Sequence, residues 1–195
     1  MNDLAFRLRD ARATLSAVAV FVVLFALYTL KHPAGFSANV VQTAANKGVL
    51  LAFVAVGQTF VVLTAGIDLS VGSVFILANC LASVLVTGSP GAVALGVAAV
   101  LGTGLACGLV NGALVVYGRL QPIVATIASG AIYFGLALAL RPEPGGDVDS
   151  TLADAVTGQS AFGVPASALV HAGAAAPLAA VLPTSAAEPA ARRAP

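Results

Sequence analysis

Long apolar stretches alternate with short polar interruptions along the first 140 residues of the chain. Five of these stretches come close to the roughly 20 apolar residues that a helix needs to cross the hydrocarbon core of a bilayer. Backbone polar groups in lipid must be paired within the segment, which favours helices. The pattern therefore predicts an all-α, polytopic membrane protein with about five transmembrane helices, over residues 13–30, 48–66, 69–86, 92–116 and 123–140.

The polar interruptions contain residues that end helices. Residues 31–35 include a proline and a glycine, and the more polar residues 37–47 that follow predict an outer loop or an interfacial segment. Residues 87–91 and 117–122 are turns by composition. The predicted transmembrane region is therefore residues 13–140 as a whole.

Three arginines, Arg7, Arg9 and Arg12, precede the first apolar stretch. Lys and Arg concentrate on the cytoplasmic side of membrane proteins, so residues 1–12 are predicted to be a cytoplasmic N-terminus. A signal peptide has a similar arrangement, but this apolar core is long and no clean small-residue cleavage site follows it. We therefore expect a retained first span in a multi-pass membrane protein.

The composition supports a lipid environment. The chain is 59% hydrophobic and 9% charged, whereas soluble domains have about 25% charged residues. Between Lys47 and Arg119 the only charged residue is Asp68. A soluble globular enzyme is excluded, and the net charge of +1 without a dense basic patch argues against nucleic acid as a partner.

The sequence contains no catalytic or metal-ligating constellation. His32 lies in a helix-breaking loop and His171 in an Ala-rich segment, neither beside a serine or cysteine partner. Cys80 and Cys107 lie inside apolar runs and are interpreted as small buried hydrophobic residues. No Gly-rich loop ends in Gly-Lys-Ser or Gly-Lys-Thr, so we expect no cofactor and no nucleotide bound by this chain.

Three glycines recur at four-residue intervals in the fourth stretch. Gly104, Gly108 and Gly112 therefore share one helix face and predict a helix-packing surface, with a hinge as the alternative. Asn111 lies beside that face and needs a polar partner on a neighbouring helix or in a wet cavity.

Asp68 is the most informative position, since a carboxylate in an apolar region needs hydrogen-bond donors. Gly66 fits a left-handed helix end, and Asp68 or Ser70 is placed to cap the helix that follows. The alternative is a broken helix that lines a substrate path, where irregular backbone faces a cavity. On that second interpretation the candidate substrate-path residues are Gln58, Asp68, Ser70 and Asn111.

Two ordered motifs resemble those of a known family. Residues 57–73, GQTFVVLTAGIDLSVGS, resemble the signature of bacterial ABC-type monosaccharide permeases, the ribose, xylose and galactoside group. Residues 108–112 and 117–126 resemble the next conserved block of that family at the expected distance. The resemblance covers residues 13–170, and Ala65 and Phe134 depart from it.

This resemblance implies a subunit of the bacterial inner membrane that works by alternating access. It implies three partners besides the lipid bilayer: ABC ATPase subunits, a periplasmic sugar-binding protein and a second permease subunit. The ATP chemistry would belong to the ATPase subunits, so the chain is expected to be a transporter component rather than an enzyme.

The C-terminal part departs from the family pattern. Residues 141–170 predict an outer loop, with 162–165 as the candidate start of a further span. Residues 171–195 are rich in Ala and Pro, and the repeated Pro would break a span; the family's coupling segment is not recognisable there. Translation out of frame and a genuine disordered tail are the two interpretations.

The sequence therefore predicts the membrane permease subunit of an ATP-driven monosaccharide importer. Two alternatives stay open. The first is a permease for another small polar solute, such as an autoinducer or a nucleoside. The second is a truncated permease fragment that transports nothing.

Overall fold

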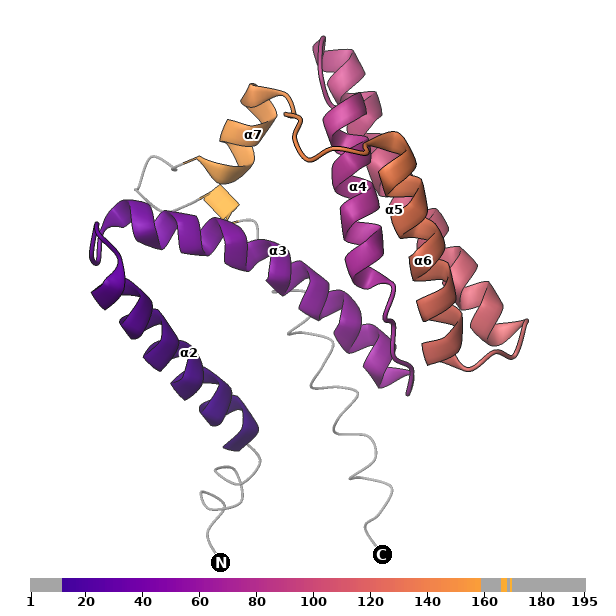
Figure 1. Cartoon of the computed structure of the whole chain (residues 1–195), viewed down its shortest axis with the longest axis horizontal. Helices are drawn as coiled ribbons and strands as arrows, with labels where there is room; N and C mark the ends of the chain where they lie inside the picture. Colours follow the sequence, from indigo (N-terminus) through magenta and orange to yellow (C-terminus); the bar gives the residue numbers. More distant parts are fainter. Residues whose placement is uncertain (1–11, 159–165, 168, 170–195) are drawn as a thin grey trace, which may run out of the picture. The chain divides into compact units, whose positions relative to one another are not determined.

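The computed structural model describes residues 12–158, 166, 167 and 169. Its described part is all-helical, which confirms the predicted fold class. The chain divides into two compact units, Met1–Lys47 and Gly48–Pro195. The helices are α2 (Arg12–Lys31), α3 (Ala38–Leu63), α4 (Val71–Leu85), α5 (Pro90–Val116), α6 (Pro122–Leu140) and α7 (Ser150–Thr157) (Figure 1).

The first unit contains α2 and the first part of α3. The turn between them includes Gly35, whose φ of 56° favours glycine. Ser37 begins the next helix: its hydroxyl oxygen accepts the Val40 N–H at 3.4 Å, and its carbonyl accepts the Val41 N–H at 3.1 Å. Of the two predictions for residues 37–47, the outer loop was therefore wrong, because a capped helix without Pro or an early Gly tolerates polar residues on its surface, while the interfacial segment stays a prediction.

In the second unit, α4 packs against both α5 and α6 (Figure 1). Their shared core contains Leu77, Cys107, Tyr133 and Ala137. A Cβ on Gly96 would overlap the Leu85 backbone, so glycine there permits the close approach of α5 to the end of α4. Apolar side chains also cover the outer surfaces of these helices, and Leu95, Leu101, Leu105 and Leu109 of α5 are 64–74% exposed, as expected for a surface that faces lipid or other protein.

Three described helices, α3, α5 and α6, are long and apolar enough to cross a membrane. All five predicted stretches are confirmed as helices, and α4, with 15 residues, is shorter than a span. The 15 residues of α4 extend about 22 Å, against a hydrocarbon core of about 30 Å. Residues 64–70, which precede α4, are not helical.

Residues 141–149 form a loop, and α7 follows it. The Asp149 carboxylate accepts the Leu152 N–H at 3.0 Å and so caps α7, while the Asp149 N–H donates to the Val86 carbonyl at 2.8 Å. The loop is thereby tied to the end of α4. The candidate start of a further span at residues 162–165, and the segment 171–195, lie outside the described residues.

Candidate functional site

The candidate site forms where α3 ends and the chain runs without helix to α4. The Ala65 N–H donates to the Val62 carbonyl at 2.9 Å, and the Gly66 N–H donates to the Val61 carbonyl at 3.0 Å. This pair of bonds is a Schellman motif. In this motif the residue directly before the second donor, here Gly66, has a left-handed backbone. That residue is Ala65, with a φ of 58°. The prediction that Gly66 would be the left-handed residue was therefore wrong by one position.

Side chains from three places hold the backbone that follows. The Gln58 amide Nε2 donates to the Asp68 carbonyl at 2.6 Å. The Leu69 N–H donates to Thr126 Oγ1 at 3.0 Å, and the Ser70 N–H donates to Asp68 Oδ1 at 2.8 Å. Because lipid offers no hydrogen bonds, non-helical backbone at membrane depth persists only where protein groups pair with it in this way.

Asp68 begins a chain of hydrogen bonds that runs from the half-buried carboxylate into the buried interior. The Ser70 hydroxyl donates to Asp68 Oδ1 at 2.7 Å, and the Asn111 amide Nδ2 donates to Ser70 Oγ at 2.7 Å. The Asn111 Oδ1 atom in turn lies 3.3 Å from the Tyr133 hydroxyl, which also lies 3.2 Å from the Cys107 carbonyl. Ser70 is fully buried and Asn111 is 6% exposed. The network thus connects the helix break to α5 and α6.

Neither candidate cap works as the sequence predicted. Ser70 occupies the N-cap position of α4, but its side chain makes no capping hydrogen bond to the helix. Asp68 accepts the N–H of Ser70 itself instead of an N–H from the first turn. The two side chains are therefore bonded to each other, and the carboxylate stabilises the break more than the helix.

A cavity of about 300 Å³ adjoins the break. Two of the predicted substrate-path residues, Asp68 and Asn111, line it, whereas Gln58 and Ser70 do not. The other polar side chains in its wall are the hydroxyls of Thr64 and Thr126, and its lining contains no Lys, Arg or His. Its size is at the lower end of the range of small-molecule pockets, roughly 300–1,000 Å³.

The predicted glycine face of α5 is open in the described part of the chain. A Cβ added to Gly104, Gly108 or Gly112 would meet no atom within 4 Å. Gly108 and Gly112 line the cavity instead. Its use as a helix-packing surface stays a prediction.

Sequence reasoning missed the residues of α6 that complete the site. Thr126, Ser129, Gly130 and Tyr133 are all buried. A Cβ on Gly130 would lie 3.2 Å from the Cα of Ser70, so this glycine lets α6 approach the break. The signal was present in the spacing: polar or small residues recur every three or four positions along one face of an otherwise apolar helix.

The described residues contain no group of three or more His, Cys, Asp or Glu side chains that could hold a metal ion. Cys107 is buried, as predicted, whereas Cys80 is half-buried, and both are free thiols.

Comparison with known proteins gives a consistent family. The family described as "Branched-chain amino acid transport system / permease component" matches residues 40–188. The match thus includes much of the segment from residue 171 onward, whose reading frame stays a prediction. No solved structure matches the chain.

Curated relatives include three proteins with sugar names. The ribose import permease protein RbsC of Escherichia coli (strain K12) is 34% identical over 122 residues, 63% of this chain and 38% of the relative. The L-arabinose ABC transporter permease protein AraH of Azospirillum brasilense is 35% identical over 120 residues, 62% of this chain and 35% of the relative. The galactofuranose transporter permease protein YtfT of Escherichia coli (strain K12) is 42% identical over 83 residues, 42% of this chain and 24% of the relative. The matched part spans 38% of the length of the ribose permease.

Proposed function

Because this chain belongs to the family of branched-chain amino acid transport system permease components, we propose that it forms part of the permease of an ATP-driven monosaccharide importer. The family is one of transport permeases rather than enzymes, and its members with apolar helices of this kind are multi-pass proteins of the bacterial inner membrane. Relatives named for ribose, arabinose and galactofuranose support a sugar as the solute.

The observation that carries this proposal is the cavity at the helix break. Its wall offers one carboxylate, from Asp68, one amide, from Asn111, and two hydroxyls, from Thr64 and Thr126. Sugar hydroxyls both donate and accept hydrogen bonds, so they can donate to the Asp68 carboxylate and to the oxygen lone pairs that the protein's own hydrogen bonds leave open. Discontinuous helices that meet at a polar cavity are also typical of solute sites in transporters.

The same wall disfavours the amino acid in the family's description. An amino acid carries a carboxylate, which needs a cation or several N–H donors when it leaves water. Asp68 could pair with the ammonium group of an amino acid, but the cavity lining contains no cationic side chain for its carboxylate. A neutral polyhydroxylated solute has no carboxylate to place.

The hydrogen-bond network suggests which parts move together. Thr126 holds the backbone of Leu69, and Asn111 holds Ser70, so α4, α5 and α6 are joined at the break. In an alternating-access cycle we expect these three helices to move as one body. ATPase subunits would drive this movement, a periplasmic binding protein would deliver the sugar, and a second permease subunit would complete the path.

Solute uptake tests the proposal directly. The full chain, purified with its ATPase and binding-protein partners, is reconstituted in vesicles, and ATP-dependent uptake of radiolabelled ribose, arabinose, galactose and leucine is measured. We expect uptake of at least one sugar but not of leucine. We also expect Asp68→Asn to lower sugar uptake at least tenfold, whereas Ser89→Ala, at the start of α5 and outside the cavity lining, should leave it within twofold.

Two outcomes contradict the proposal. Uptake of leucine without any sugar would assign the cavity to another polar solute. A complex that assembles and hydrolyses ATP but moves no solute would identify the chain as an inactive fragment.

A further inference from the structure

A second cavity, of about 330 Å³, lies along α4 and α6 and shares no lining residue with the first. Its polar side chains are Asn79 and Ser83 of α4, with Arg141 and Glu143 from the end of α6 and the loop after it. Ser83 lies 13 residues along the chain from Ser70, or roughly 20 Å at helical rise. The two cavities are therefore near opposite ends of α4.

The Arg141 side chain is built into this second cavity. Its Nη1 atom donates to the Ser83 hydroxyl oxygen at 2.5 Å, and that hydroxyl donates to the Cys80 carbonyl at 2.7 Å. The loop closes around the guanidinium so tightly that a Cβ on Gly146 would overlap it, and Gly146 has a φ of 91°. The position of the guanidinium is thus defined by both α4 and the loop.

The described hydrogen bonds use only a small part of the donor capacity of Arg141. A guanidinium has five N–H donors, and Ser83 accepts from one of its nitrogens. Within the ranges that the structure describes, Arg141 forms no ion pair with a carboxylate. The cavity therefore presents donors from Arg141, a carboxylate acceptor from Glu143, and an amide from Asn79 that offers both.

The wall carries one group of each charge. A singly charged ligand would be attracted by one of them and repelled by the other, whereas a neutral polyol can accept from the guanidinium and donate to the carboxylate without repulsion. We propose that this cavity is a second binding site for a neutral monosaccharide, at the opposite end of α4 from the cavity beside Asp68. The inference rests on the proposed function, because a transported sugar would bind in the two cavities one after the other along one solute path.

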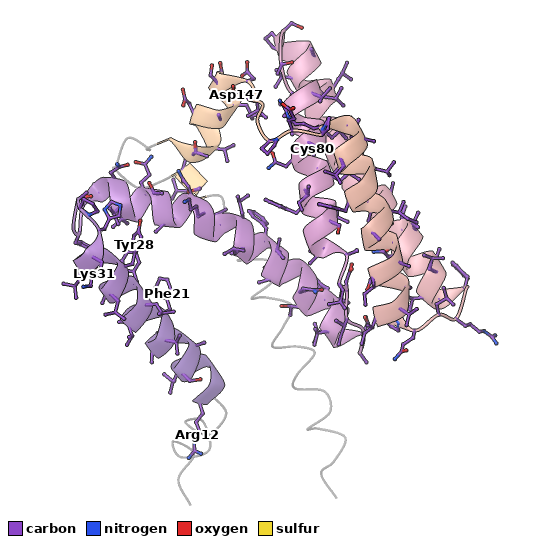
Figure 2. All side chains as sticks on the ribbon, viewed as in Figure 1. Arg12, Phe21, Tyr28, Lys31, Cys80 and Asp147 are labelled. Carbon is purple, nitrogen blue, oxygen red and sulfur yellow. The ribbon has the colours of Figure 1, made fainter. Side chains whose placement is uncertain are left out.

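The chain contains its own reporter for this site. Cys80 lines the second cavity and is labelled on α4 in Figure 2. The other cysteine, Cys107, is 6% exposed and lines neither cavity. Alkylation by N-ethylmaleimide, followed by mass spectrometry of the peptide with Cys80, therefore measures occupancy of the second cavity alone.

The experiment uses the full chain in phosphatidylcholine nanodiscs, titrated with ribose, arabinose or galactose. We expect at least one sugar to slow alkylation of Cys80 saturably. Arg141→Lys and Glu143→Gln should each raise the half-protecting concentration at least tenfold, because the first replaces the planar five-donor guanidinium by a compact ammonium and the second removes the charged acceptor. Arg119→Lys, on the exposed turn before α6, and Asp68→Asn, in the other cavity, should leave the half-protecting concentration within twofold.

Three results would overturn the inference. The first is unchanged alkylation at all sugar concentrations in a preparation whose assembled complex takes up that sugar, which refutes the second site while the proposed function stands. The second is sugar protection that survives both Arg141→Lys and Glu143→Gln. The third is protection by phosphatidylglycerol in the nanodisc instead of by sugar, which would identify a lipid headgroup site. If the complex takes up no sugar either, the proposed function and this inference fail together.

Discussion

Replacing Thr126 by valine tests whether side chains hold the helix break together. The substitution keeps the shape of the side chain but removes the oxygen that accepts the Leu69 N–H at 3.0 Å. Thr126 is 3% exposed, so no water can take its place easily. An unsatisfied buried N–H costs about 1–3 kcal/mol. We therefore expect Thr126→Val to lower the free energy of unfolding by about that amount, measured by SDS titration of the protein in mixed micelles with circular dichroism.

Thr103→Val is the matched control. Thr103 lies inside α5, and its hydroxyl donates to the Ala99 carbonyl at 2.9 Å, one turn back in the same helix. Thr126 makes an equivalent bond to the Pro122 carbonyl at 2.8 Å. Both substitutions lose this bond, but only Thr126→Val also leaves the Leu69 N–H without its acceptor. We expect Thr103→Val to change the unfolding free energy by less than about 0.5 kcal/mol. If the two variants agree within that margin, the break does not depend on Thr126, and our account of it is wrong.

Two further predictions concern backbone geometry. Ala65→Gly should raise the free energy of unfolding by about 1 kcal/mol, because Ala65 is left-handed with a φ of 58°. The control is Ala113→Gly, within α5, which should lower the free energy of unfolding. A similar loss of stability in both variants would contradict the Schellman motif. Gly130→Ala should lower the unfolding free energy by about 1–3 kcal/mol, because the new Cβ would lie 3.2 Å from the Ser70 backbone. Gly102→Ala, where nothing lies within 4 Å, should instead raise it by up to about 1 kcal/mol, and equal effects at both sites would refute the close approach of α6.

Local features of the sequence predicted the helices well. The apolar stretches over residues 69–86, 92–116 and 123–140 correspond to α4, α5 and α6 within a few residues. Apolar length is a property of a short window, so it can be recognised without knowledge of the rest of the fold. The error over residues 37–47 has a local origin too: polarity indicates exposure to water, whereas helix formation there follows from the Ser37 cap.

The candidate site could be predicted only in part. Asp68 and Asn111 stood out because polar groups in an apolar region need partners, and both do line the cavity. Thr126 and Tyr133 did not stand out, since hydroxyl-bearing residues in apolar helices often bond only to their own backbone. Their roles depend on which residues of other helices lie opposite them.

The sequence by itself determined that the chain is helical, that its middle is surrounded by lipid or protein, and that one carboxylate lies at a helix junction. The tertiary structure decided how that carboxylate and its neighbours are satisfied. Asn111 meets Ser70 across 41 residues, and Leu69 meets Thr126 across 57. Hydropathy and capping act over a few residues, whereas these hydrogen bonds exist only after α4, α5 and α6 have packed.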